Sequence, residues 1–308
     1  MKKFILTVTI SLLLIISFNV SSWAIDYTIL WEDIDEQTIE YLEDIGINEL
    51  TFEDLFNVTP TRVIKFIFEL IIEKGISIIL DGVFSHTGDD SVYFNRKGRY
   101  STLGAYNSPE SPYYKWYKFT NYPDKYQSWW GFVTLPEVIE EGEEYRNFIN
   151  GKGGIVEKWL KAGADGFRLD VADELPDEFI KLLRNRIKEI NPDAYLMGEV
   201  WEDASNKKAY GQRRRYFTNA ELDSVMNYPF RTAILDFMRG RDSGAGLRNT
   251  VMTIAENYPQ QVVQCNMNLL GTHDTPRILT ALVDDFDGSR EEKAKRHLSR
   301  NNMEVARD

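Results

Sequence analysis

The chain has 308 residues, of which 43% are hydrophobic and 27% charged, so it is long enough for one large α/β barrel or two ordinary domains. Its formal net charge of −12 argues against nucleic acid or an anionic membrane as a partner, because either would select a basic face. Cys265 is the only cysteine and there are 3 histidines, which excludes an intrachain disulfide and argues against a zinc site.

Residues 1–24 are typical of a secretory signal peptide. Lys2 and Lys3 precede an apolar run that extends from Phe4 to Val20, and Ser22-Trp23-Ala24 contains small residues suited to cleavage. An uncleaved anchor is the alternative, but the run is only marginally long for a membrane span. We therefore expect a secreted or cell-surface protein with no stable membrane association after cleavage.

A helix followed by a strand recurs along residues 27–308. The predicted helices are 34–45, 63–74, 155–162 and 179–190, and the strands that follow them are 47–52, 76–80, a strand ending at Asp170, and 195–198. Further strands are expected at 224–228 and 262–270. Repeated αβ units with short links predict a parallel sheet, and acidic residues at successive strand ends would converge on its mouth.

Residues 88–137 break this pattern. The segment is rich in Tyr, Trp, Pro and Gly, and it includes Trp129 and Trp130. It is too long for a plain connection, so we expect an inserted excursion that covers the mouth. The tail 289–308 is strongly charged and is expected to form an exposed helix with a loose end.

The stretch from Gly166 to Glu174 reads Gly-Phe-Arg-Leu-Asp-Val-Ala-Asp-Glu. Its strand-like alternation places Arg168 and Asp170 on the same side of the chain. An arginine keeps a neighbouring carboxylate ionised, which suits a nucleophile or an electrostatic stabiliser. Taken alone, a surface ion pair at a strand end explains the stretch equally well.

Five motifs, in order, resemble those of the α-amylase family of retaining glycoside hydrolases. They are Leu80 to His86, Leu135 to Val138, Gly166 to Glu174, Gly198 to Trp201, and Leu270 to Arg277. The Val-Ala-Asp-Glu that ends at Glu174 is most similar to the neopullulanase, cyclomaltodextrinase and amylopullulanase branch. The resemblance implies a (β/α)8 TIM barrel with an excursion domain after the third strand. Because the sequence stops shortly after the seventh-strand motif, we expect the barrel to be incomplete, without its eighth strand and the C-terminal β domain.

The resemblance also implies a catalytic set. Retaining hydrolysis needs a nucleophile and an acid/base roughly 5 Å apart. Asp170 matches the nucleophile and Glu199 the acid/base, whose pKa the neighbouring Val200 and Trp201 are expected to raise. Asp274 matches the third carboxylate, which stabilises the oxocarbenium-like transition state.

Substrate-binding residues follow from the same motifs. His86 and His273 would donate hydrogen bonds to sugar hydroxyls, although a histidine at a strand end is by itself more often structural. Asp81 would orient Arg168 or a sugar hydroxyl; a helix N-cap is the alternative. Trp201 would stack on a glucose ring, whereas for Trp129 and Trp130 packing within the excursion is an equal alternative.

The chemistry requires no cofactor. Ser85 stands where the first motif usually has asparagine, often a calcium ligand or loop anchor, so calcium binding is in doubt. The expected function is a secreted α-glucan hydrolase that cleaves α-1,4 bonds, and in some relatives α-1,6 bonds, of starch, pullulan or maltodextrins. Two alternatives are an inactive remnant that only binds oligosaccharide and a membrane-anchored relative without hydrolase activity.

Overall fold

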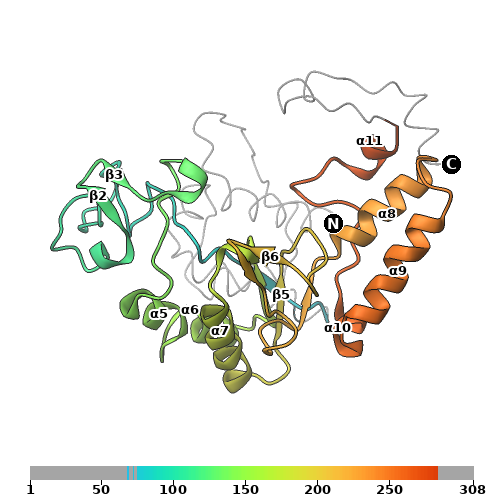
Figure 1. The fold of residues 1–308 in the computed structure, drawn as a ribbon. Coiled ribbons are helices and arrows are strands. Elements are labelled where there is room, and N and C mark those ends of the chain that lie inside the picture. Colours follow the sequence, from blue (N-terminus) through green and yellow to red (C-terminus); the bar gives the residue numbers. More distant parts are fainter. Residues whose placement is uncertain (1–67, 69–71, 73–74, 284–308) are drawn as a thin grey trace, which may run out of the picture. The chain divides into compact units, whose positions relative to one another are not determined.

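A sheet of four short parallel strands organises the part of the chain that the structure describes (Figure 1). The structure is a computed structural model, and it describes residues 68, 72 and 75–283. The chain divides into two units, residues 1–77 and 78–308. The sheet and its helices belong to the second unit.

The strands lie in the order β1-β4-β5-β8. They are β1 (Ile79–Gly82), β4 (Gly166–Leu169), β5 (Tyr195–Gly198) and β8 (Ser224–Val225). In the register, Asp81 is opposite Arg168 and Leu169 is opposite Gly198. Because the strands are parallel, the residues that follow their carboxyl ends meet at one edge of the sheet. A Cβ at residue 198 would lie 2.6 Å from Leu222 Cδ1, so a larger residue than Gly198 would require the Leu222 side chain to move.

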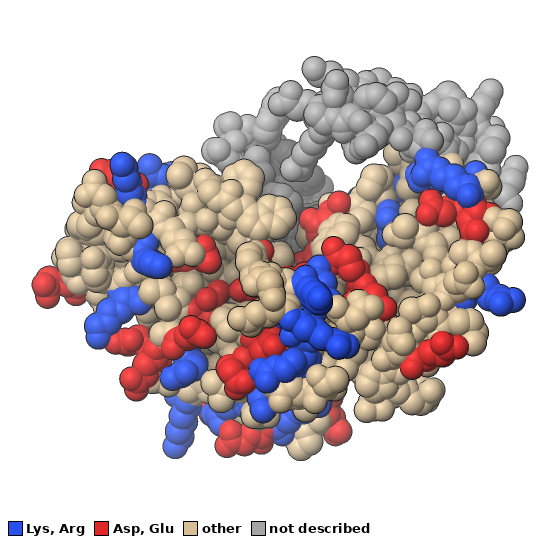
Figure 2. All heavy atoms as spheres, viewed as in Figure 1, with Lys and Arg blue, Asp and Glu red and all other residues tan. Residues whose placement is uncertain are grey.

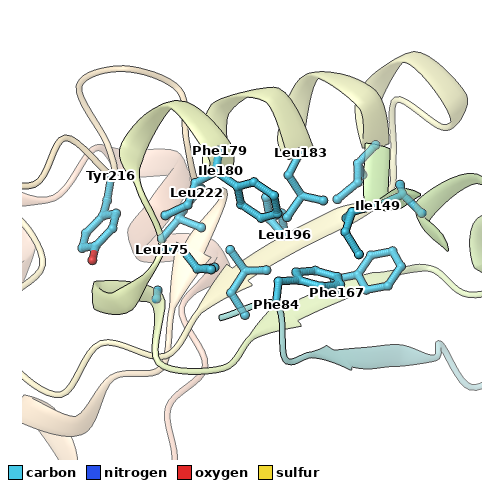
Figure 3. Close-up of a cluster of buried hydrophobic side chains, with 14 of the residues drawn as sticks. Phe84, Ile149, Phe167, Leu175, Phe179, Ile180, Leu183, Leu196, Tyr216 and Leu222 are labelled. Carbon is cyan, nitrogen blue, oxygen red and sulfur yellow. The ribbon is translucent and has the colours of Figure 1, made fainter. Parts of the chain in front are cut away.

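Three helices pack together beside the sheet: α5 (Glu143–Asn150), α6 (Ile155–Lys161) and α7 (Asp177–Ile190). In α7 the apolar residues recur at helical spacing, and Phe179, Ile180, Leu183 and Ile187 are all buried. Figure 3 shows the α7 side chains pointing toward residues of the sheet such as Leu196. This interface is the main hydrophobic core, and it fixes the strands that carry the site.

Residues 88–137 form an irregular, aromatic-rich segment with little regular structure. Its elements are η2 (Tyr114–Trp116), β2 (Phe119–Asn121), β3 (Lys125–Tyr126) and η3 (Trp129–Gly131). The ring of Phe94 is fully buried among other aromatic rings, including Tyr117 at 4.9 Å and Tyr126 at 4.7 Å between centroids. The end of the segment pairs with the residues that follow β1, through an antiparallel bridge between His86 and Glu137.

The C-terminal elements are mostly helical: α8 (Tyr228–Met238), α9 (Ala245–Asn257), α10 (Gln260–Cys265) and α11 (Ile278–Val283). Here the predicted strand 262–270 is wrong over its first part, because residues 260–265 form α10 after Pro259. The short apolar pair Val262-Val263 has no clear period, so sequence cannot separate strand from helix there. In this stretch, Met267 joins the parallel arrangement through a bridge to Met226.

Other element predictions agree closely with the structure. The strand 195–198 is confirmed without change, and the predicted helix 155–162 corresponds to α6. Helix α7 begins two residues earlier than predicted, after Pro176. The predicted strand 224–228 is shorter, because Asn227 accepts a hydrogen bond from Phe230 N and starts α8 with Pro229 in its first turn. Strand β1 begins at Ile79 rather than at residue 76.

Several predictions lie outside the described residues and stay predictions. They are the signal peptide 1–24, the helix 34–45, the strand 47–52, most of the helix 63–74, the tail 289–308, and the incompleteness of the barrel. Of the described residues, none belongs to a helix long and apolar enough to cross a membrane.

Glu140 generates a prediction about stability. It is buried between the end of the aromatic segment and α5. Burial raises the pKa of Glu140 to about 8, and the charges of Glu137, Glu141 and Glu174 add to the shift. The folded state therefore binds this proton more tightly than the unfolded state, whose pKa is near 4.5. Its contribution to the free energy of unfolding should be complete below pH 4.5 and should be lost as the pH rises to 8.

The variant Glu140→Gln keeps the size of the side chain and cannot ionise. In urea titrations at several pH values, we expect it to be more stable than the wild type by up to about 5 kcal/mol at pH 8, with little difference at pH 4.5. The variant Glu110→Gln serves as the matched control, because Glu110 is exposed and its charge is not among those that shift the pKa of Glu140. Equal pH dependence in wild type and Glu140→Gln would contradict the assignment.

Candidate active site

The side chain of Arg168, on β4, lies where three strand ends meet. Its Nη1 donates to Asp81 Oδ1 at 2.7 Å and to Asp170 Oδ1 at 2.9 Å. Its Nη2 lies 2.8 Å from Glu199 Oε2. The Arg168 side chain is 9% exposed and that of Glu199 is 4% exposed. One buried guanidinium therefore holds a carboxylate from β1, one from the end of β4 and one from the end of β5.

The electrostatics of this cluster follow from burial and charge. Burial alone would lower the pKa of Arg168, but Asp81, Glu199 and Asp170 raise it above its ordinary value. Partial burial raises the pKa of Asp81, although the contact with Arg168 opposes this shift. A fixed positive charge among three acids reduces the cost of placing them together.

Both oxygens of Glu199 have N–H donors. The backbone N–H of Val171 donates to Oε2 at 2.8 Å, and Trp201 Nε1 donates to Oε1 at 3.0 Å. The Trp201 ring stacks on Tyr228 with centroids 4.0 Å apart and an angle of 11° between planes. The setting of Glu199 is therefore more polar than its neighbours Val200 and Trp201 suggest in sequence. Tyr228 covers one face of Trp201, and Trp201 as a whole is 44% exposed.

Val171 has an unusual backbone conformation directly after Asp170. Its φ of 39° and ψ of 64° place a β-branched residue in the left-handed region. Such a conformation costs on the order of 1–3 kcal/mol and persists only where the surroundings enforce it. This conformation accompanies the N–H contact with Glu199. No sequence signal marks it, since a left-handed position usually favours glycine or asparagine.

An aromatic row extends from His86 into the segment 88–137. The His86 ring stacks on Trp129 at 5.3 Å, and Trp129 stacks on Trp130 at 4.6 Å between centroids. Trp130 is 70% exposed, and its Nε1 donates to Glu174 Oε1 at 3.0 Å. The exposed Tyr210 also donates to Glu174, at 2.6 Å. Trp129 thus packs within the segment, while Trp130 presents a ring at the surface.

His86 itself pairs with Ser85, whose Oγ lies 3.0 Å from His86 Nδ1. Burial lowers the pKa of His86, although the negative charges of Asp170 and Glu174 oppose the shift. The ring is therefore neutral at pH 7, and its remaining nitrogen can face a ligand. In the described ranges, no three His, Cys, Asp or Glu side chains are arranged to hold a metal ion.

His273 and Asp274 contact each other outside the Arg168 cluster. His273 Nε2 lies 3.1 Å from Asp274 Oδ2, and both side chains are exposed. Within residues 75–283 the structure gives neither of them a hydrogen bond or ion pair with Arg168. His273 still lies within electrostatic reach of Asp81, whose pKa its charge lowers. Tyr228, which stacks on Trp201, also contacts the residue before His273, because its hydroxyl lies 3.5 Å from Thr272 Oγ1.

The structure thus joins five of the eight residues singled out in the sequence: Asp81, Arg168, Asp170, Glu199 and Trp201. It places His86 within electrostatic reach of Asp170, and it leaves His273 and Asp274 as a separate pair. Sequence reasoning missed Val171, Tyr210 and Tyr228. Of these, only Tyr210 had a usable signal, an aromatic residue beside Gly211 in a polar stretch, which is typical of an exposed turn.

Comparison with known proteins gives consistent matches. The model of the alpha amylase catalytic domain family matches residues 63–301. Amylopullulanase of Thermoanaerobacterium saccharolyticum is 39% identical over 264 residues, which cover 76% of this chain and 20% of that protein. Cyclomaltodextrinase of Thermoanaerobacter pseudethanolicus is 30% identical, over 79% of this chain and 44% of that protein. The chain spans less than half the length of these relatives.

Among solved structures, the type III pullulan hydrolase from Thermococcus kodakarensis superimposes with a TM-score of 0.61 and 30% identity. The match covers 72% of this chain and 37% of that structure. It agrees with a parallel sheet and helices of the TIM-barrel type.

Removal of the central arginine should destabilise the fold. The variant Arg168→Met leaves Asp81, Asp170 and Glu199 without their shared countercharge, so we expect a loss of about 3–5 kcal/mol in the free energy of unfolding at pH 7. Urea titration measures it. The exposed Arg213→Met is the control, with an expected change of about 0.5 kcal/mol or less. Similar stabilities for the two variants would show that the cluster does not need the arginine.

Proposed function

The chain belongs to the alpha-amylase catalytic domain family, and on that premise we propose that it is a glycoside hydrolase that cleaves α-glucans with retention of configuration. The observation that carries the proposal is the contact of one buried arginine with both Asp170 and Glu199. Double displacement requires two carboxyl groups close together, one as nucleophile and one as acid/base, and these two lie at neighbouring strand ends.

In the first step, an oxygen of Asp170 attacks the anomeric carbon. The bond between that carbon and the glycosidic oxygen breaks, and its electron pair goes to the leaving oxygen, which takes a proton from Glu199. In the second step, Glu199 removes a proton from a water molecule, which attacks the anomeric carbon and releases Asp170. The two carboxyl groups and the attacking water supply every proton and electron pair, so the proposed chemistry needs no cofactor.

The contacts of the site suit these two roles. Arg168 Nη1 donates a hydrogen bond to Asp170 Oδ1, which fixes the position of the proposed nucleophile. Trp201 and Val171 fix the plane of the Glu199 carboxyl group, which must face the leaving oxygen in the first step and water in the second. Asp274 and His273 would contribute as the third carboxylate and a hydroxyl-binding residue if their loop approaches bound sugar.

The proposed substrates are starch, pullulan or maltodextrins, cleaved at α-1,4 and in some cases α-1,6 bonds. Relatives named amylopullulanase and cyclomaltodextrinase support this class. His86 and Asp81 would bind hydroxyls of the reacting sugar, and the exposed rings of Trp130 and Tyr210 offer apolar faces to further glucose units. Acidic and basic side chains are interspersed over the face seen in Figure 2, as suits a neutral polymer. Secretion through residues 1–24 would place the enzyme where such polymers occur.

The direct test compares the variants Asp170→Asn and Glu199→Gln with the wild type on maltotriose, pullulan and cyclodextrin. We expect the release of reducing ends by Glu199→Gln to fall by roughly 10²–10⁴-fold, and that by Asp170→Asn to fall at least as far. The control is Asp193→Asn, an exposed carboxylate in the turn before β5, at the opposite ends of the strands.

The proposal fails if a folded wild-type protein releases no more reducing ends than Asp170→Asn. Binding of oligosaccharide without hydrolysis would then favour the alternative of an inactive remnant.

A further inference from the structure

The loop that follows Asp170 is held by one later segment of the chain, residues 207–216, which includes the hairpin of β6 (Lys208–Ala209) and β7 (Gln212–Arg213). Lys207 Nζ lies 2.8 Å from Asp173 Oδ2. The hydroxyls of Tyr210 and Tyr216 donate to Glu174 and to Asp173 Oδ1 respectively. We call residues 207–216 the clasp.

Arg214 makes the most extensive contacts of the clasp with the loop. Its Nη1 donates to the carbonyl of Asp173 at 2.8 Å, and its Nη2 donates to the carbonyls of Leu175 and Ala172. Its Nε lies 2.7 Å from Asp177 Oδ1. The side chain is 7% exposed, and the guanidinium lies over the Tyr216 ring, 5.1 Å from its centroid.

These contacts lie directly after a strained residue, and they add to the backbone hydrogen bonds from Ala172 N to Glu199 O and from Glu174 N to Val171 O. Val171 precedes the three carbonyls that Arg214 holds, and a valine with a φ of 39° would otherwise relax. A guanidinium presents five donors in a rigid plane and can bind several carbonyls at once, whereas an ammonium cannot reproduce that fork. The Val171 N–H that contacts Glu199 Oε2 lies directly before the turn that Arg214 holds.

We propose that Arg214 is a positioning residue for hydrolysis. It holds the carbonyls of residues 172, 173 and 175, keeps Val171 left-handed, and so aims the Val171 N–H at the acid/base Glu199. The role rests on the proposed function, because Arg214 acts on Glu199 through the backbone that follows Asp170. The support that the clasp gives to the turn after Asp170 is a structural property, so it can also be tested by measuring stability.

The test is a double-mutant cycle with Arg214→Lys and Val171→Gly. Glycine adopts a positive φ without strain, so the Val171→Gly variant no longer needs Arg214 to hold the turn. We expect Arg214→Lys alone to lower kcat by about 10-fold or more, with KM changed by less than about 3-fold. Added to Val171→Gly, the same substitution should lower kcat by less than about 3-fold. The matched control Arg213→Lys, on the same hairpin, should leave kcat unchanged.

An equal loss of kcat in both backgrounds overturns the proposal, because Arg214 would then act independently of Val171. A loss that appears only in KM also overturns it. If Arg214→Lys does not fold, Asp177→Asn removes the ion pair that orients the guanidinium while it keeps the carbonyl contacts, and it should show a smaller kcat loss with the same dependence on residue 171.

The activity of the wild type shows whether the proposed function or the role of Arg214 has failed. If that protein has no hydrolase activity, the cycle is measured by urea unfolding. Arg214→Lys should then destabilise the wild type more than it destabilises the Val171→Gly variant. Equal losses in the free energy of unfolding in the two backgrounds would contradict the claim that Arg214 holds Val171 in its conformation.

Discussion

The positive charge of Arg168 cannot be buried at the strand ends without neutralisation, and this constraint arranges the site. A buried guanidinium is tolerated only with carboxylate partners, and the register of β1, β4 and β5 supplies Asp81, Asp170 and Glu199 around it. The hydrophobic contact of α7 with the sheet holds these strands, so core packing and active-site geometry depend on each other. The same contacts that make the cluster stable bring two carboxylates together for chemistry.

The contacts of Arg168 fix the side chains of its three carboxylate partners, but the backbone after Asp170 is held by other residues. Val171 adopts a costly conformation, and the residues behind it are held by Arg214, Lys207 and Tyr216. Around Glu199, the stack of Trp201 on Tyr228 provides a second support. A strained turn that is over-determined by its neighbours is common at functional sites, where the cost of strain is offset by correct placement of reacting groups.

Much of this arrangement could be predicted from sequence, and the reasons are local. Helix α7 has a clear helical period and lies between Pro176 and Pro192, and the strand 195–198 is a short apolar run that follows it. The alternation of Arg168 and Asp170 indicated that they share a side. Residues 262–265 were wrongly assigned to a strand, because two adjacent valines show no periodicity that would distinguish a strand from a helix. Val171, Arg214 and Tyr228 were missed because their roles arise only from contacts with residues that are distant in sequence. The contact between His273 and Asp274, apart from the Arg168 cluster, could likewise not be predicted from the order of the motifs.

The central claim is that Asp170 acts as a nucleophile beside the acid/base Glu199. Double displacement inverts the anomeric carbon twice, so the first product released from an α-glucan must carry the α configuration. Proton NMR of the anomeric signals during the first minutes of maltodextrin hydrolysis measures this before mutarotation obscures it. The account predicts that the α-anomer accumulates first and the β-anomer follows slowly. Initial appearance of the β-anomer would mean a single inverting displacement and would contradict the assignment of Asp170.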